Sequence, residues 1–271
     1  MGDPMAASMS PSQKLPRFEF VLLSTAGLLL FFGVWTLAAI LGFAPEQFLP
    51  PPWTVAQKFY DLTQHPFVGY TLQQHLLSSF GRMGMGFGLA VAIGVPLGLL
   101  LGWFRWLDVV VTPIFDALRF VAPIAWVPFA ALWFGTGIGG PVLVIFTGAF
   151  PPCVINTYRG ARFVEPYLIE AARTLGARNW QIITEVLLPA SVPSIVAGLR
   201  VSAGLAWQSL VGAELIVASS GIGYLLVKGQ ASISTSTVMA GMIAIGIVGF
   251  AIDVLLQAFE ARIHRRRGRA G

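Results

Sequence analysis

Few residues in this sequence have the types and spacing that catalysis or metal binding requires. The histidines His65, His75 and His264 are scattered and have no metal-ligand spacing, so a metal site is not expected. Cys153 is the single cysteine and has no histidine or acid near it in the sequence, which predicts a small buried apolar residue. We find no nucleophile–base arrangement and no Walker A motif, so the usual phosphate-binding loop is missing. We therefore expect no catalytic residue and no metal or cofactor bound by this chain.

One glycine-rich segment, Gly135–Gly140, does satisfy the pattern Gly-x-Gly-x-x-Gly. A dinucleotide site of that kind needs a preceding strand and a following helix within one unit. Here long apolar runs surround the pattern and Pro141 follows it directly. We interpret the segment as a turn between two apolar helices.

Two charged residues, Arg82 and Glu214, fall inside apolar runs, where we expect the outer half of a membrane. Intramembrane charges are costly, and they pair with each other or line a watery cavity. Two interpretations stay open. Arg82 helps an anion to pass along a route that Glu214 shapes, or the two form a structural ion pair, which we favour. Gln208 and Ser209 are polar residues in mid-span and fit either interhelical hydrogen bonding or the lining of a path.

Composition places the whole chain in a lipid bilayer. Of the 271 residues, 56% are hydrophobic and only 11% are charged, whereas soluble proteins carry about 25% charged residues. The formal net charge is +5, but the basic residues cluster where a membrane topology explains them, so nucleic-acid binding is not expected. The first apolar run is too long for a cleaved signal and predicts a retained span.

The apolar runs predict an all-α integral membrane protein with about six spans. A membrane helix needs about 20 apolar residues. Suitable runs lie at 20–45, about 76–104, two between 119 and 159, about 193–218 and about 238–259. Under this topology the outer loops carry only two basic residues, Lys58 and Lys228. Because basic residues favour the cytoplasmic side of a membrane, we expect both termini in the cytoplasm.

Local patterns refine this arrangement. Small residues repeat every fourth position in the second span and predict a ridge that another helix can approach closely (Gly86, Ala90, Gly94, Gly98 and Gly102). Val55, Phe59 and Leu62 share one face of a predicted amphipathic helix at the outer surface. We expect 108–119 near the inner face, with a local ion pair between Asp116 and Arg119. Pro123 and Pro128 should kink the third span, and Arg200 should anchor at the membrane interface.

A charge-rich stretch between the fourth and fifth spans predicts two short cytoplasmic helices. Pro166 suits a first helical position and Gly176 a helix C-cap. Asn179 suits the N-cap of the second helix, which we expect Pro189 to end. The apolar stripe of this second helix should pack against the membrane helices (Trp180, Ile183 and Leu187). A hydrated hairpin of this kind is either an ordinary amphipathic loop or a docking element for a partner.

The residues of this stretch resemble the EAA loop of binding-protein-dependent ABC importer permeases. Glu170-Ala171-Ala172 is followed after three residues by Gly176 and later by Leu188-Pro189, and only Val186 departs from the family pattern, where isoleucine is usual. Further segments are similar to the nitrate/taurine/sulfonate branch (Pro123-Ile-Ala-Trp-Val-Pro, Leu132-Trp-Phe-Gly, Asn156-Thr-Tyr, Gly198-Leu-Arg, Gly204-Leu-Ala-Trp and Gly221-Ile-Gly-Tyr). The likeness covers roughly residues 45–260.

This resemblance implies a coupling helix that docks into a cytoplasmic ATPase subunit. The residues implied in coupling are Glu170, Ala171, Ala172, Arg173, Leu175 and Gly176. ATP and Mg²⁺ would bind at the partner ATPase. The implied assembly is a permease homodimer with two ATPase subunits and an extracytoplasmic solute-binding protein, in the bacterial inner membrane and in contact with its lipid.

The sequence thus predicts a permease for a small anionic solute such as nitrate, taurine or an alkanesulfonate. Bicarbonate and a thiamine-precursor pyrimidine stay open as substrates of the same machinery. An ion-gradient-driven secondary transporter and a scaffold that moves nothing are the alternatives from other classes. By residue number, we expect a cytoplasmic tail at 1–18, a permease domain at 19–261 with the coupling loop at about 163–190, and a basic cytoplasmic tail at 262–271.

Overall fold

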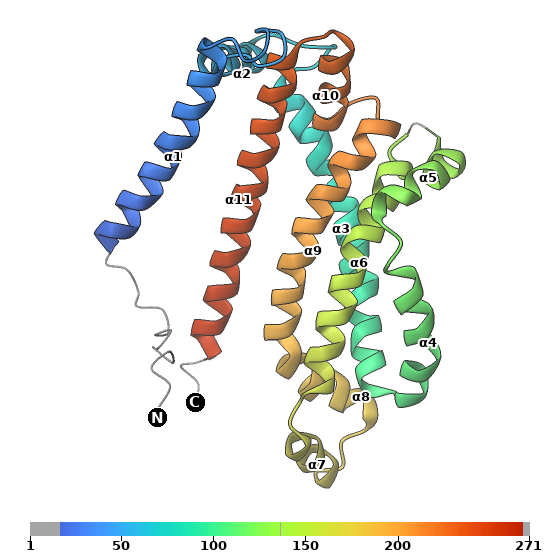
Figure 1. The fold of residues 1–271 in the computed structure, drawn as a ribbon. Coiled ribbons are helices and arrows are strands. Elements are labelled where there is room, and N and C mark those ends of the chain that lie inside the picture. The colour runs from blue at the N-terminus through green and yellow to red at the C-terminus, as the bar shows by residue number, and fades with distance from the viewer. Residues whose placement is uncertain (1–16, 136, 268–271) are drawn as a thin grey trace, which may run out of the picture. The chain divides into compact units, whose positions relative to one another are not determined.

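The computed structural model describes residues 17–135 and 137–267. Of the two predicted terminal tails, residues 1–16 and 268–271 lie outside this range, whereas residues 262–267 belong to the last helix. Helices account for nearly all of the described chain, which confirms the predicted all-α class (Figure 1). In chain order they are α1 (Arg17–Ile40), α2 (Pro52–Gln64), α3 (Leu72–Trp103), α4 (Arg105–Leu118), the short 3₁₀ helix η1 (Pro123–Trp126), α5 (Val127–Phe134), α6 (Gly139–Arg162), α7 (Pro166–Thr174), α8 (Asn179–Gln181), the π-helical segment η2 (Ile182–Leu187), α9 (Leu188–Val217), α10 (Ile222–Ala231) and α11 (Thr235–Arg267).

The chain forms two compact units that meet in sequence between Gln57 and Lys58. In the first unit, α1 exposes its apolar side chains, as a lipid-facing helix does, and the Trp35 indole Nε1–H donates to the Pro50 carbonyl at 3.2 Å. In the second unit, Lys58 pairs with Asp61 at 2.7 Å. The hydrogen bond from Lys58 is the main reason why the pKa of the Asp61 carboxyl lies below its ordinary value.

The core of the second unit is built by α3, α6 and α9, which run side by side (Figure 1). The small-residue ridge of α3 faces α6, as the four-residue repeat predicted. A Cβ atom placed on Gly98 would lie 2.6 Å from the Thr157 Cβ, and one on Gly86 would lie 2.7 Å from the Ile145 Cβ. Such distances leave no room for a side chain, so the glycines set how closely the two helices pack. Cys153 is buried in the same contact, as predicted.

Five helices are long and apolar enough to cross a membrane, or six if one bent pair counts as a single span. That pair consists of α4 followed by η1 and α5, with a bend of 87° at the break between Leu118 and Pro123. The predicted third span, a kinked helix from about 119 to the 135–140 turn, is therefore wrong. Its helical part has two short segments, because Pro123 and Pro128 start new helices instead of kinking a continuous one. The segment 108–119, which we expect near the inner face, forms most of the first half of the bent pair.

A second correction concerns Pro189, which does not end a helix. Helical structure continues from Asn179 to Val217, with η2 immediately before α9. Proline lacks an N–H and crowds the carbonyl four residues earlier, here that of Glu185. Because Glu185 lies in the π-helical segment, the wider turns there accommodate the proline. The sequence predicted that the fifth span starts near Pro193, whereas the helix that contains it already begins at Asn179.

The helix pair α9 and α11 is joined by an ion-pair group that the sequence analysis missed. Arg200 donates from Nε to Asp253 at 2.9 Å and from Nη1 to Glu260 at 3.4 Å. Arg200, which we expect at the membrane interface, thus also bridges α9 to α11. The local pair expected between Arg119 and Asp116 is present, at 2.8 Å.

Candidate functional site

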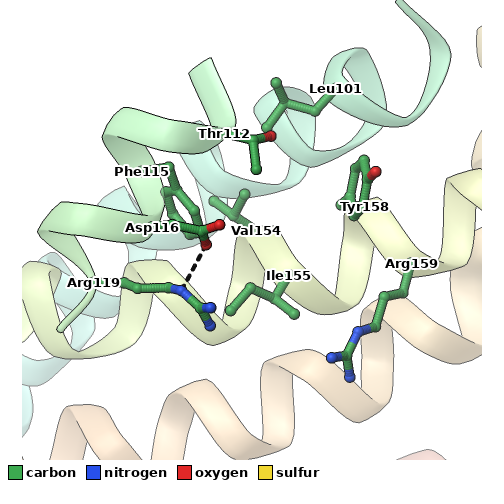
Figure 2. A pocket seen from close by; sticks show the side chains of 9 residues that line it. All are labelled: Leu101, Thr112, Phe115, Asp116, Arg119, Val154, Ile155, Tyr158 and Arg159. Atoms are coloured by element: carbon green, nitrogen blue, oxygen red, sulfur yellow. Dashed lines mark ion pairs between the residues drawn. The ribbon is translucent and has the colours of Figure 1, made fainter. Parts of the chain in front are cut away.

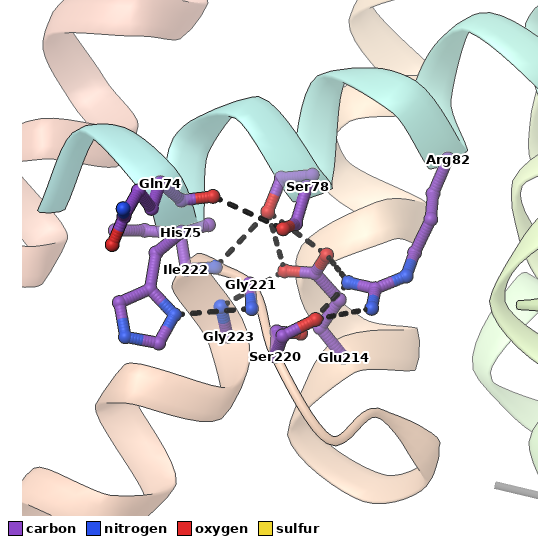
Figure 3. Close-up of polar contacts among 10 residues, drawn as sticks. Gln74, His75, Ser78, Arg82, Glu214, Ser220, Gly221, Ile222 and Gly223 are labelled. Atoms are coloured by element: carbon purple, nitrogen blue, oxygen red, sulfur yellow. Dashed lines mark hydrogen bonds and ion pairs between the residues drawn. The ribbon is translucent and has the colours of Figure 1, made fainter. Parts of the chain in front are cut away.

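The most polar buried region of the second unit lies where α3 begins and α9 ends, and we call it the Glu214 cluster. It contains the side chains of His75, Ser79, Arg82, Glu214 and Ser220, together with the backbone N–H groups of residues 221–223 (Figure 3). Glu214 is 1% exposed and Arg82 is 7% exposed. Two buried charges in an apolar bundle need partners for every polar atom.

The Glu214 carboxylate, on α9, receives hydrogen bonds from α3 and from the start of α10. Arg82 donates from Nη1 to Glu214 Oε1 at 2.7 Å. The Ser79 hydroxyl lies 2.8 Å from both carboxylate oxygens, and the backbone N–H of Gly223 donates to Oε2 at 3.0 Å. The carboxylate thus joins α3, α9 and the start of α10.

The same cluster holds the short loop that connects α9 to α10. Arg82 also donates to the Ser220 carbonyl and to the Ser220 hydroxyl, each at 2.7 Å. The Ile222 N–H donates to Ser79 Oγ at 3.0 Å, and the Gly221 N–H donates to His75 Nδ1 at 3.2 Å. His75 Nε2 lies 3.2 Å from the Phe67 carbonyl, so the contacts fit a neutral imidazole with its proton on Nε2.

Two glycines of the loop are required by this geometry. Gly221 has φ +111°, and a Cβ atom there would collide with the Glu214 carboxylate. A Cβ atom on Gly223 would lie 2.6 Å from the Glu214 Cβ. The Gly-Ile-Gly segment therefore allows the backbone to approach the carboxylate closely.

The structure brings Arg82 and Glu214 into contact but keeps Gln208 and Ser209 apart from them. Gln208 is exposed on α9, whereas Ser209 is buried against Gly148 of α6. Sequence reasoning missed His75, Ser79 and Ser220. The spacing of His75, Ser79 and Arg82 by four and then three residues places them on one helical face, and this signal could have identified the first two.

The Glu170 loop, residues 163–190, lies at the opposite end of the second unit from α10 (Figure 1). No residue of α7 is buried, and Leu175 is 87% exposed. The N–H of Gly176, at φ +83°, donates to the Arg173 carbonyl at 2.9 Å, and Ala177 N–H donates to Ala172 at 3.0 Å. These bonds close α7 in the way that a glycine C-cap does.

The loop is attached to the bundle through its second half. Ile183 and Leu187 are buried with Leu99 and Ala161, as the apolar stripe predicted. Trp180 does not join them and is 67% exposed, because the stripe is interrupted where α8 gives way to η2. In α7 the Arg173 guanidinium lies 5.8 Å from the ring centre of Trp103. The loop therefore presents an exposed helix on an anchored base.

Neither region resembles a metal or catalytic centre. Within the two described ranges, no group of three histidine, cysteine or acidic residues is placed to hold a metal ion. Within the Glu170 loop, a hydrogen bond to the Glu165 carboxylate raises the pKa of the Tyr167 phenol above its ordinary value. What the geometry offers is a membrane-spanning bundle with an exposed helix at one end and a pinned loop at the other.

A bundle of this kind is typical of a membrane transport subunit, and comparison with known proteins defines the family. The family described as "Binding-protein-dependent transport system inner membrane component" matches residues 94–269. The chain belongs to this family, the permease subunits of ABC transporters. It is thus a multi-pass membrane protein of an inner-membrane transport system and a transport subunit without catalytic activity of its own. The family implies an ATPase and a solute-binding protein as partners.

Individual relatives place the chain in the nitrate, taurine, sulfonate and bicarbonate branch. It is 34% identical to the taurine transport system permease protein TauC of Escherichia coli, over 92% of this chain and 90% of that protein. It is 35% identical to the putative aliphatic sulfonates transport permease protein SsuC of Bacillus subtilis, over 87% and 84%. It is 33% identical to the nitrate import permease protein NrtB of Synechocystis, over 79% and 80%.

A solved structure supports the fold. A chain from inward-facing crystals of the MetNI methionine ABC transporter matches with a TM-score of 0.56 at 20% identity, over 69% of this chain and 95% of that one. Family membership sets aside the two alternatives from other classes, the gradient-driven transporter and the inert scaffold.

Proposed function

We propose that this chain forms the translocation path of an ATP-driven importer for a small anion of the nitrate, taurine or alkanesulfonate class. The carrying observation is the Glu170 loop. None of the residues of its helix α7 is buried, and the loop is fixed to the bundle through η2. An exposed, capped helix on a rigid base is suited to receive force from a partner. The relatives named for taurine, aliphatic sulfonates and nitrate support the solute class.

In this proposal α7 enters a cleft of the ATPase at Glu170, Ala171 and Ala172, and the two alanines keep the helix slim. Arg173, Leu175 and Gly176 complete the joint: Leu175 supplies exposed apolar contact, and Gly176 closes the helix. ATP and Mg²⁺ bind at that partner. Its movement is passed to α9, because η2 and α9 continue from the same loop without a break in the helix.

The Glu214 cluster has a structural role in this proposal. Arg82 donates to Glu214 and to the Ser220 carbonyl of the α9–α10 loop. Glu214 also accepts from the Gly223 N–H, so both oxygens of the carboxylate have a donor. Of the two interpretations of this pair, we propose the structural one. Gln208 is exposed in mid-span and stays a candidate for the path, while Ser209 serves packing against α6.

The assembly we propose is a permease homodimer with two ATPase subunits in the cytoplasm and a binding protein outside, both termini of each permease being cytoplasmic. Bicarbonate and a thiamine-precursor pyrimidine are the alternative solutes. Site-specific labelling of Lys228 from outside and of residues in α7 from inside tests the orientation. Labelling with the opposite sidedness would refute it.

The direct test is reconstitution in vesicles with the ATPase and the binding protein. We expect uptake of taurine, ethanesulfonate or nitrate that requires hydrolysable ATP. Uptake driven by a sodium or proton gradient in vesicles without the ATPase would refute the proposed function.

A further inference from the structure

A cavity of about 190 Å³ lies among α3, α4 and α6 in the second unit, away from the Glu214 cluster (Figure 2). Its lining combines charged, aromatic and aliphatic side chains (Leu101, Thr112, Phe115, Asp116, Arg119, Val154, Ile155, Tyr158 and Arg159). The volume admits a solute of a few heavy atoms, since one liquid water takes about 30 Å³. Asp116 lies on α4 and Arg119 directly follows it, in a bent helix pair that is a candidate span, and charged groups within a span are functional-site candidates.

The carboxylates at this cavity already have partners. Asp116 accepts from Arg119 at 2.8 Å. Asp108, just outside the lining, accepts from the Thr112 hydroxyl at 2.6 Å and from the Tyr158 hydroxyl at 3.1 Å. A cationic ligand would therefore compete with Arg119 for Asp116, and with the Thr112 and Tyr158 hydroxyls for Asp108.

The guanidinium of Arg159 is different. Within residues 17–135 and 137–267 it makes no side-chain hydrogen bond and no ion pair, and it is exposed. The formal charge of the lining is +1, from Arg119 and Arg159 against Asp116. Asp108, just outside the lining, brings the local sum to zero, but its carboxylate is bonded to the Thr112 and Tyr158 hydroxyls and not to Arg159. The unpaired Arg159 guanidinium is suited to an oxyanion, which it can bind through two N–H groups.

The apolar part of the lining adds a second requirement. Leu101, Phe115, Val154 and Ile155 contribute aliphatic and aromatic surface next to the charged groups. A fully inorganic anion such as nitrate has nothing to place against this surface. A short alkyl group would bury apolar area there, at about 0.8 kcal/mol for each CH₂.

We infer that this cavity binds a small organic oxyanion with a short alkyl chain, of the alkanesulfonate class. Arg159 binds the sulfonate, and Phe115, Val154 and Ile155 contact the chain. The inference rests on the proposed function and specifies its substrate class. Arg159 also borders a second cavity, of about 400 Å³, that includes Phe163, Glu165 and Leu168 of the Glu170 loop. One guanidinium thus links the cavity between α4 and α6 to the loop end of the bundle.

The test measures binding to the permease itself. The full chain, in nanodiscs of phosphatidylcholine and without the binding protein, is dialysed against radiolabelled ethanesulfonate. We expect saturable binding at one site per chain. Nitrate lacks the two alkyl carbons, so displacing the bound ethanesulfonate should take a nitrate concentration roughly ten or more times that of unlabelled ethanesulfonate. Equal competition by nitrate would overturn the assignment to organic anions.

Two variants test the residues. Arg159→Gln removes a charge-assisted contact and should weaken ethanesulfonate binding roughly tenfold or more. Ile155→Phe keeps every charge but fills the cavity, and it should also abolish binding. The control Arg262→Gln, at an exposed arginine of α11, should stay within about twofold of the wild type. Size-exclusion profiles verify folding, and if Arg159→Gln does not fold, Ile155→Phe and the nitrate competition decide.

Two further outcomes are informative. If anionic phosphatidylglycerol in the nanodisc eliminates ethanesulfonate binding, the cavity holds a lipid headgroup and the inference is overturned. Import of a sulfonate by the complete ATP-driven complex, without any binding of ethanesulfonate to the permease, would refute the cavity site and leave the importer standing. Binding of ethanesulfonate to the permease without ATP-dependent import would support the cavity site and refute the proposed importer function.

Discussion

Replacing Arg82 with methionine keeps the length and apolar stem of the side chain but removes three hydrogen bonds. These are the bonds to Glu214 Oε1, to the Ser220 carbonyl and to the Ser220 hydroxyl, each at 2.7 Å. The Glu214 carboxylate, 1% exposed, would keep only Ser79 and Gly223 as donors. Removing one partner of a buried pair costs about 3–5 kcal/mol, because an uncompensated charge stays buried.

For a chain of this size each 1 kcal/mol shifts a melting temperature by about 2–4 °C. We therefore expect Arg82→Met to lower the apparent melting temperature of the detergent-purified chain by roughly 6–20 °C. The double variant Arg82→Met/Glu214→Gln removes the charge as well and should recover part of this loss. Arg262→Met, at an exposed arginine, should change it by less than about 2 °C.

The comparison of single and double variants carries the reasoning. If Arg82→Met melts like the wild type, or if the double variant loses the sum of the two single losses, the pair is not a coupled structural unit. A change in solute selectivity without any loss of stability would favour the translocation-path interpretation instead.

Three further predictions follow from backbone geometry and packing. Gly221→Ala places a Cβ atom against the Glu214 carboxylate and should lower the melting temperature more than Gly42→Ala, whose φ is also positive but whose surroundings are open; equal shifts would contradict the close approach. Gly98→Ala should destabilise the chain by about 1–3 kcal/mol against Thr157, whereas Gly88→Ala, with open space, should be neutral or stabilising, as thermal melts of both variants can establish. Glu170→Lys and Gly176→Pro should leave membrane insertion intact and abolish solute-stimulated ATP hydrolysis in the reconstituted complex; normal uptake by either variant would count against the coupling role of α7.

The parts of the fold that local spacing determines could be predicted from the sequence. Apolar run lengths indicated the spans, and the four-residue repeat from Gly86 to Gly102 indicated the packing of α3. The 87° break after Leu118 could not be predicted, because Pro123 and Pro128 signal an interruption without stating its angle. The helix through Pro189 was missed because a π-helical segment removes the clash on which the prediction relied.

The candidate sites divide in the same way. The residues of the Glu170 loop are consecutive in the sequence, so their pattern could be recognised from the sequence alone. Two of the three partners of Glu214, Ser79 and Arg82, lie more than 130 positions away in the sequence. The contacts of Ser79 and His75 with residues 222 and 221 span similar separations. Nothing within a short window links Arg200 to Asp253 either. Such contacts depend on which helix faces which, and that is decided by packing across the bundle.

The uninterrupted helical path from Asn179 to Val217 has a consequence for angular phase. Along an α-helix each residue turns the chain by about 100°, so the direction in which Glu214 points is tied to the direction of the Glu170 loop. The π-helical segment Ile182–Leu187 has wider turns, which absorb an extra residue with little rotation of α9 beyond it. Deleting a single residue between Leu188 and Glu214, in the regular α-helix, would rotate Glu214 by about 100° relative to the loop. Glu214 would then turn away from Ser79 and Arg82, so the length of helix between the Glu170 loop and Glu214 sets the alignment of the polar cluster.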